Sequence, residues 1–175
     1  GLVRTFQIAR ELEEMTVLEN LMLAPQNQLG EQMWRAVAPG SHGRKGVADD
    51  ERILREEVWE TLDQFELAHL ADEYAGTLSG GQRKLLELAR ALLADPEVLL
   101  LDEPLAGVNP TLEVKLLEQI DELRDEGYTF LLVEHDMDVI MNHCERVIVM
   151  NQGDVLVEGS PEEVQTDERV IEAYL

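Results

Sequence analysis

The sequence is poor in positive charge and in cysteine. Lysine and arginine together supply 14 of its 175 residues, against 37 aspartates and glutamates, so the formal net charge is −23. This charge repels phosphate backbones and anionic membrane surfaces, which argues against nucleic acid as a partner. Cys144 is the single cysteine, so no intrachain disulfide can form and a cysteine-based zinc site is not expected.

Long apolar runs and a targeting segment are also lacking. The longest uninterrupted apolar stretches, such as Val98 to Leu101, are far shorter than the roughly 18 residues that cross a bilayer. The opening residues, Gly1 to Gln7, include no initiator methionine and none of the regions of a signal peptide. We therefore expect a soluble chain that has been cut from something longer.

Lysine is the scarcest of the charged residues, with only Lys45, Lys84 and Lys115 in the whole chain. An acid-rich, lysine-poor surface is typical of a protein solvated in concentrated salt, where screening removes the repulsion between like charges. The composition therefore predicts a halophilic source. An acidic soluble domain of ordinary origin has the same composition and remains the alternative.

Hydrophobic periodicity predicts strands and helices in alternating order. The expected strands are Leu2–Gln7, Glu97–Leu101, Tyr128–Val133 and Arg146–Met150, and the expected helices are Glu51–Phe65, Leu67–Glu73, Ser79–Ala94, Leu112–Glu126 and Met137–His143. This βαβ alternation predicts an α/β fold with a mostly parallel sheet. Asn151–Asp154 then predicts a tight turn into Val155–Val157, giving a hairpin at the edge of the sheet.

Capping and turn residues divide the chain further. Thr16, followed by Glu19, predicts the N-terminal cap of a helix that ends near Leu23. The stretch from Pro25 to Asp50, with its glycines and prolines, is expected to be a loop or partly ordered insertion. The four expected parts are residues 1–24, a strand and helix; 25–50, the insertion; 51–94, a helical subdomain; and 95–175, the C-terminal part of the core with short acidic helices.

The segment Leu78–Gln82 stands directly before an apolar-periodic helix. The backbone N–H groups and the dipole of such a helix start form a site for a phosphate. Ser79 and Gln82 are also spaced as a capping box, which explains these two residues without a ligand. The box leaves Gly80 and Gly81 unexplained, because each glycine in the first turn costs about 1 kcal/mol relative to alanine. That loss makes sense where another backbone or a phosphate must come close.

Two adjacent carboxylates, Asp102 and Glu103, end the apolar strand that begins at Val98. Sheets of α/β proteins bind their ligands at this end of the strands. Asp102 is expected to hold Mg²⁺, directly or through water, and Glu103 to polarise the water that attacks a γ-phosphate. A pair of solvated acids at a strand end is the alternative.

His135 follows the next predicted strand by two residues and is expected at the same edge of the sheet as Asp102 and Glu103. An imidazole there can hydrogen-bond a γ-phosphate oxygen and position the attacking water. A polar loop histidine without a chemical role is the alternative.

In order and spacing, the segment Ser79–Gln82, the strand ending in Asp102 and Glu103, and His135 together resemble the ABC ATPase family. The resemblance implies that Gln7 is the Q-loop glutamine, which contacts Mg²⁺ or the attacking water and senses the membrane partner. It implies that the ATP of a second subunit is bound by the signature residues Ser79, Gly80, Gly81 and Gln82. It places the D-loop at Ala106, Gly107, Val108 and Asn109.

Four further segments are similar to the ATP-binding subunits of branched-chain amino acid importers. They are Arg4–Gln7, Met15–Asn20, Ala106–Pro110 and Val170–Leu175. The insertion between Gln26 and Asp50 also lies where that subfamily has one. Related subunits for urea, short amides or lipopolysaccharide share much of this pattern, so the transported substrate is inferred by analogy.

The sequence departs from the family in one respect. The phosphate-binding loop of the pattern Gly-x-x-x-x-Gly-Lys-Ser/Thr should precede Gln7 and is absent from the 175 residues. Gly40–Gly46 is only a near match, because Arg44 and not glycine stands directly before Lys45, and no strand leads into the segment. The resemblance therefore implies a truncated P-loop ATPase core, inactive by itself, whose sheet exposes an edge.

The resemblance implies an ATP-hydrolysing subunit on the cytoplasmic face of the cell membrane. It would use ATP and Mg²⁺, pair with a second ABC ATPase subunit, and drive permease subunits that import branched-chain or other amino acids. The alternatives are transport of urea, amides or lipopolysaccharide, a soluble ABC protein of another class, and a non-catalytic fragment.

Overall fold

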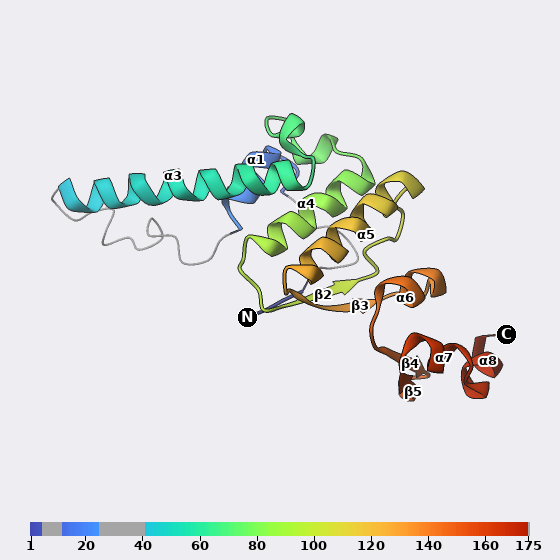
Figure 1. Cartoon of the computed structure of the whole chain (residues 1–175). Helices are drawn as coiled ribbons and strands as arrows, with labels where there is room; N and C mark the ends of the chain where they lie inside the picture. The colour runs from blue at the N-terminus through green and yellow to red at the C-terminus, as the bar shows by residue number, and fades with distance from the viewer. Residues whose placement is uncertain (5–11, 25–40, 175) are drawn as a thin grey trace. The chain divides into compact units, whose positions relative to one another are not determined.

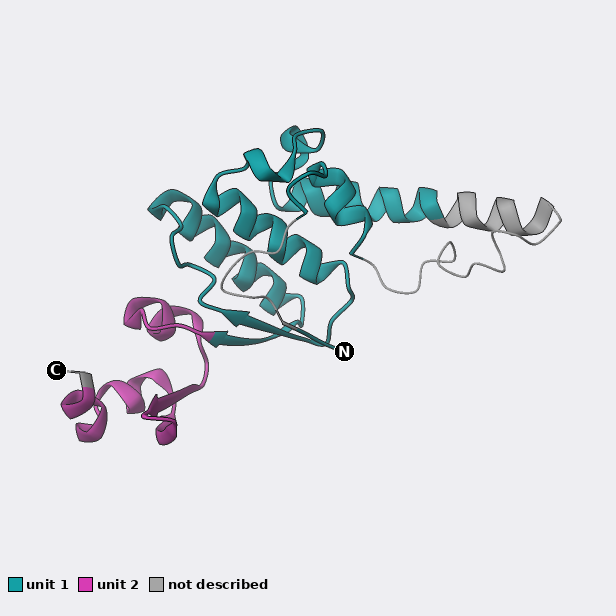
Figure 2. Cartoon of the chain, turned by 180° about the vertical axis from the view of Figure 1, so that it is seen from behind, with its two compact units in different colours: residues 1–132 teal, residues 133–175 magenta. Residues whose placement is uncertain are grey.

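The computed structural model describes residues 1–4, 12–24 and 41–174, apart from the side chains of 4, 41–50 and 174. These residues form two compact units, 1–132 and 133–175, shown in teal and magenta in Figure 2. Gln7 and most of the predicted insertion lie outside the described residues. None of the described helices is both long and apolar enough to cross a membrane.

The first unit combines a three-stranded sheet with helices. Its elements in chain order are β1 (Leu2–Arg4), α1 (Val17–Met22), α3 (Ser41–Gln64), the 3-10 turns η2 (Ala68–Leu70) and η3 (Ala75–Thr77), α4 (Gly80–Leu92), β2 (Val98–Asp102), α5 (Pro110–Asp125) and β3 (Thr129–Val133). The strand order is β1-β2-β3, and β1 runs parallel to β2 with Leu2 opposite Val98. Helices α4 and α5 lie side by side next to these strands (Figure 1).

The core of this unit forms where the apolar faces of the helices meet the buried side of β2. Leu99 and Leu101 alternate with less buried neighbours along the strand, as expected for one face of a sheet. The fully buried side chains around them include Val17, Leu21, Val58, Leu62, Phe65, Leu86, Leu116 and Leu123. Burying each of these side chains contributes about 1.5–3 kcal/mol, so the packing holds the end of β2 in place.

The second unit is a small hairpin and three short helices. Its elements are α6 (Met137–His143), β4 (Val147–Asn151), β5 (Asp154–Gly159), α7 (Pro161–Gln165) and α8 (Glu168–Tyr174). The two strands are antiparallel, and the turn between them has positive φ at Gln152 and Gly153, which matches the right-handed twist of the strands. Its own core consists of Val147, Val149, Val164 and Val170.

Most of the predicted elements are confirmed, and so is the α/β fold. Thr16 caps α1 and forms a capping box with Glu19. Helix α5 ends at a C-cap before Gly127, whose φ of 107° is the left-handed conformation that favours glycine. Cys144 is half-buried against the second core.

Two expectations about the fold are wrong. Helix α3 begins at Ser41, so the expected loop is helical over 41–50, since the single glycines there each cost only about 1 kcal/mol. The expected helix Leu67–Glu73 is a single 3-10 turn. The predicted hairpin is present as β4 and β5, but it belongs to the second unit, so its place at the edge of the three-stranded sheet stays a prediction.

Candidate functional site

The segment Leu78–Gln82 forms the start of α4, as the sequence predicts. The Ser79 side chain accepts a hydrogen bond from the Gln82 backbone at 3.4 Å, and the Gln82 side chain accepts one from the Ser79 backbone at 2.9 Å. The predicted capping box is therefore present. Within the described part of the chain, the N–H groups of Gly80 and Gly81 donate to no acceptor. These two donors, at the positive end of a 13-residue helix, can bind an anion.

The two glycines of this segment have different surroundings. A Cβ added to Gly81 would lie 2.5 Å from Cδ1 of Leu112, so the close packing against α5 would have to shift to admit a side chain there. A Cβ added to Gly80 would meet only the carbonyl oxygen of Gly107, at an ordinary 3.6 Å. Packing within the chain therefore explains Gly81 but not Gly80.

The two predicted catalytic carboxylates stand at the C-terminal end of β2. Leu99 and Leu101 anchor the strand in the core, and both Asp102 and Glu103 are half-buried. Glu103 has a φ of 46°, in the left-handed region that few residues other than glycine adopt. Such strain persists only where surrounding structure enforces it, and it is common at functional sites.

The segment Ala106–Asn109 turns the chain from β2 into α5. The Ala106 N–H donates to the Glu103 carbonyl at 3.2 Å, and Gly107 has a φ of 74°. Asn109 caps α5, because its side chain accepts from the Leu112 backbone at 3.1 Å. Sequence reasoning missed this capping role, although Asn followed by Pro110 before an apolar helix is its usual signal. The turn lies beside the start of α4, since a Cβ added to Gly80 would lie 3.6 Å from the Gly107 carbonyl oxygen.

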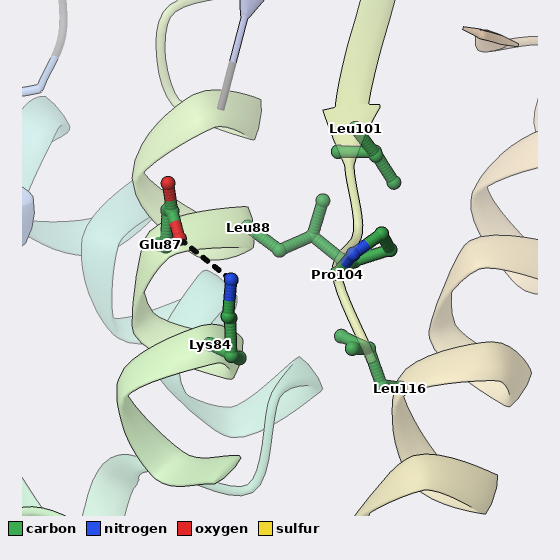
Figure 3. Close-up of a pocket in the computed structure, with 6 residues that line it drawn as sticks. All are labelled: Lys84, Glu87, Leu88, Leu101, Pro104 and Leu116. Atoms are coloured by element: carbon green, nitrogen blue, oxygen red, sulfur yellow. Dashed lines mark ion pairs between the residues drawn. The ribbon is translucent and has the colours of Figure 1, made fainter. Parts of the chain in front are cut away.

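A small cavity separates α4 from the end of β2 and from α5 (Figure 3). Its volume is about 10 Å³, which is room for about one water molecule and far too small for a nucleotide. It is lined by Lys84, Glu87, Leu88, Leu101, Pro104 and Leu116. The Lys84 Nζ and a Glu87 carboxylate oxygen are 4.0 Å apart, and both side chains are largely buried. Helix α4, which begins with the signature segment, therefore packs next to Pro104 in the turn that follows Glu103.

His135 belongs to the second unit. Its side chain is 78% exposed, whereas that of the preceding Glu134 is 2% exposed. The Nδ1 atom of His135 lies 3.7 Å from a Glu134 carboxylate oxygen. Asp136 then caps α6 by accepting N–H bonds from Asp138 and Val139. Because the two units are described separately, the placement of His135 beside Asp102 and Glu103 stays a prediction.

The other predicted Mg²⁺ contact, Gln7, lies outside the described residues. Within the described ranges, no three His, Cys, Asp or Glu side chains gather as a metal site. Mg²⁺ is usually held by one or two carboxylates together with phosphate oxygens and waters, so it needs no such cluster. The single carboxylate of Asp102 at a strand end fits this donor set.

Comparison with known proteins agrees with this arrangement. The family model described as ABC transporter matches residues 2–106, and the model described as branched-chain amino acid ATP-binding cassette transporter matches residues 155–175. The whole chain is 43% identical to the probable branched-chain amino acid transport ATP-binding protein LivG of Archaeoglobus fulgidus. It is 40% identical to the high-affinity protein LivG of Escherichia coli K12, again over the full chain. The chain spans 65% of the length of the first relative and 68% of the second.

Solved structures show the same similarity. The chain superposes over its full length on 68% of MJ1267, an ATP-binding cassette of an ABC transporter, with a TM-score of 0.76 at 37% sequence identity. The ADP conformation of that protein gives a TM-score of 0.75 over 99% of the chain and 68% of MJ1267. The resemblance predicted from the motifs is confirmed, and the chain belongs to the ABC transporter family.

Proposed function

We propose that the chain serves in the ATP-hydrolysing subunit of an ABC importer for branched-chain amino acids. The observation that carries the proposal is the juxtaposition of three features in one unit. The N–H groups of Gly80 and Gly81, which have no acceptor among the described residues, lie at the start of α4. The turn at Gly107 lies beside them. The carboxylates of Asp102 and Glu103 stand at the end of β2. The relatives that match the whole chain are named for branched-chain amino acid transport.

The residues divide the chemistry between binding and hydrolysis. Asp102 would hold Mg²⁺, which supplies charge stabilisation for the β- and γ-phosphates when bound. Glu103 would accept the proton of the attacking water, and its fixed backbone would aim the carboxylate. His135 and Gln7 would orient the γ-phosphate and the water beside the same nucleotide. Each side chain acts by position and charge, which are the main sources of catalysis in phosphoryl transfer.

The signature segment would act on the nucleotide of a second subunit. The N–H groups of Gly80 and Gly81 and the hydroxyl of Ser79 are donors at the positive end of a helix, which suits a γ-phosphate. Ala106–Asn109, the D-loop, would lie at the same interface because Gly107 lies beside Gly80. A dimer would then contain two composite sites, each built from both subunits.

The subunit would work at the inner face of the membrane with permease subunits, in a cytoplasm rich in salt. The composition supports a salt-rich cytoplasm, since the 23 uncompensated negative charges of this chain repel one another and salt screens that repulsion. The four-part division predicted from the sequence, with a signature subdomain at 51–94, stays a prediction within this proposal.

Transport into membrane vesicles tests the proposed function. A subunit of the relatives' full length that contains these 175 residues is assembled with its permeases, and uptake of radiolabelled leucine, urea and an amide is compared with and without Mg-ATP. We expect ATP-dependent uptake of leucine alone. Uptake of urea or the amide instead would show that the substrate assignment is wrong. An absence of ATP hydrolysis would show that the assignment as an ATPase is wrong.

A further inference from the structure

Asn20 is a polar side chain that is fully buried in the first unit, at 0% exposure. Its carbonyl oxygen accepts the Leu12 N–H at 2.9 Å. Its amide group donates to the backbone carbonyls of Leu12 at 3.1 Å, Met15 at 3.3 Å and Thr16 at 2.9 Å. A buried amide with all of its groups satisfied specifies one arrangement of the chain around it. Asn20 therefore fixes the segment 12–16 against α1.

The segment held by Asn20 pairs with the chain that leads into α4. The Ala75 N–H donates to the Met15 carbonyl at 2.9 Å, and the Gly76 N–H donates to the Glu13 carbonyl at 3.1 Å. An antiparallel bridge between Thr16 and Tyr74 continues this pairing. The Val17 and Leu18 N–H groups then donate to the carbonyls of Glu73 and Ala71. The segments 13–18 and 71–76 thus form a short backbone ladder.

The ladder contains a close approach between Gly76 and Glu13. A Cβ added to Gly76 would lie 3.2 Å from both the Cβ and the carbonyl oxygen of Glu13. That is tighter than ordinary contact, so a side chain at this position would push the paired Glu13 backbone away by a few tenths of an ångström. Asn20 holds the segment 12–16 of the ladder, and Gly76 lies in the segment 71–76 that pairs with it.

The ladder ends three residues before the signature helix. The Leu78 N–H donates to the Ala75 carbonyl at 3.2 Å, and Leu78 itself is buried. The next residue, Ser79, is the N-cap of α4. The Met15 carbonyl accepts from both Asn20 and Ala75, so two hydrogen bonds connect the Asn20 side chain to the turn that sets Ser79.

We propose that Asn20 is a positioning residue that fixes the start of the signature helix through the ladder between 13–18 and 71–76. This inference rests on the proposed function, in which the N–H groups of Gly80 and Gly81 must meet a phosphate. A misplacement of about 1 Å can cost on the order of a hundredfold in rate, so the donors need an anchored helix start. Asn20 supplies the anchor without contacting the nucleotide.

The variant Asn20→Asp tests the anchor, because it keeps the shape and one acceptor but removes both N–H donors. Hydrogen exchange on this chain measures the ladder directly. We expect the Ala75 and Gly76 amides to exchange faster by about tenfold or more, with the buried amides of α5 unchanged. The control is Asn142→Asp, which removes a comparable bond to the Asp138 carbonyl on the exposed side of α6. It should leave the ladder unchanged.

The functional readout separates positioning from simple loss of stability. In a subunit of the relatives' full length, Asn20→Asp should lower kcat by on the order of tenfold or more while the affinity of the monomer for Mg-ATP stays at the parent value. Gly76→Ala should do the same by separating the two backbones. A general loss of folding would instead accelerate exchange throughout α5, and that result would overturn the proposal.

Two other outcomes distinguish the inference from the function beneath it. If the ladder amides exchange faster but kcat is unchanged, Asn20 holds the ladder without positioning the signature, and the inference fails. If Ser79→Arg also leaves kcat unchanged, the signature does not take part in hydrolysis and the proposed function fails with it.

Discussion

Gly81 and Leu112 lie so close between α4 and α5 that a side chain at position 81 would have to displace Leu112. A Cβ on Gly81 would lie 2.5 Å from the Leu112 Cδ1 and 3.0 Å from its Cβ. Both residues belong to helices that flank the turn Ala106–Asn109, so this contact sets the distance between the signature and that turn. The second glycine of the signature therefore has a structural role that is independent of any ligand.

Substituting the two glycines should separate packing from binding. Gly81→Ala is expected to destabilise the first unit by about 1–3 kcal/mol, because the added methyl overpacks against Leu112. Gly80→Ala should change stability by no more than about 0.5 kcal/mol, since its Cβ finds ordinary contact with the Gly107 carbonyl. Urea unfolding of the two variants measures the difference. Equal losses of stability in the two variants would contradict the conclusion that packing explains Gly81 but not Gly80.

Glu103→Gln should abolish turnover and preserve nucleotide binding in a full-length subunit. The amide keeps the size of the side chain but cannot accept the proton of the attacking water. Glu66→Gln is the matched control, because Glu66 is also a glutamate with positive φ, at 55°, and it pairs with Lys115 on the surface. Single-turnover hydrolysis is the measurement. Near-parent hydrolysis by Glu103→Gln would remove Glu103 from the catalytic role.

Local sequence signals predicted the elements that position the site. Thr16 with Glu19 and Ser79 with Gln82 are spaced as capping boxes, and both boxes are present. The apolar run before Asp102 became a strand because it can fill a sheet buried in the core. These features depend on neighbours in sequence, which is why the sequence alone was enough.

Features that depend on distant contacts could not be predicted in this way. The reason for glycine at Gly81 is a side chain thirty-one positions later, at Leu112, and the burial of Asn20 depends on a ladder to residues beyond 70. Packing between residues distant in sequence determines which residue fits at these positions, and the hydrophobic periodicity of the sequence does not reveal that packing.

Asp167 should make the stability of the second unit depend on acid pH. The side-chain hydrogen bond from Arg169 is the largest cause that lowers the pKa of Asp167 from 3.8 to about 2. Because the folded pKa is the lower one, this stabilisation is present above pH 4 and is lost as the pH falls through the interval down to about 2.

Asp167→Asn should therefore lower the thermal midpoint at neutral pH and have no effect near pH 2. Glu162→Gln, at an exposed carboxylate of α7, serves as the control. Circular dichroism melts from pH 7 to pH 2 provide the comparison. A loss of stability that is the same at every pH would show that the Arg169 contact does not depend on the charge of Asp167.

Folding should depend on salt, because the chain carries a net charge of −23. Repulsion among these charges falls as the Debye length shrinks from about 10 Å at 0.1 M to 3 Å at 1 M. We expect thermal midpoints that rise with KCl well into the molar range. Replacing the exposed acids Glu57, Glu60 and Asp63 of α3 by amides should reduce the slope. A midpoint that is flat or falls would remove the halophilic interpretation.

The signature should act in trans, which a titration of an intact partner subunit with this chain can test. The chain could present Ser79 and the N–H groups of Gly80 and Gly81 to the γ-phosphate of the partner, since a helix start needs no other loop to bind an anion. Ser79→Arg would fill that position with a long side chain. It would also remove an N-cap, at a cost of about 1 kcal/mol.

The capping loss can be controlled within the same chain. Ser160 caps α7 with a capping box to Glu163, so Ser160→Arg removes an equivalent cap far from any predicted role. We expect the parent chain and Ser160→Arg to alter the ATP-dependent dimerisation of the partner, measured by sedimentation, and Ser79→Arg to leave it unaltered. Because both substitutions add the same side chain and remove the same kind of cap, a difference between them isolates the contact with the partner's nucleotide. Equal behaviour of all three chains would show that the segment Leu78–Gln82 does not work in trans.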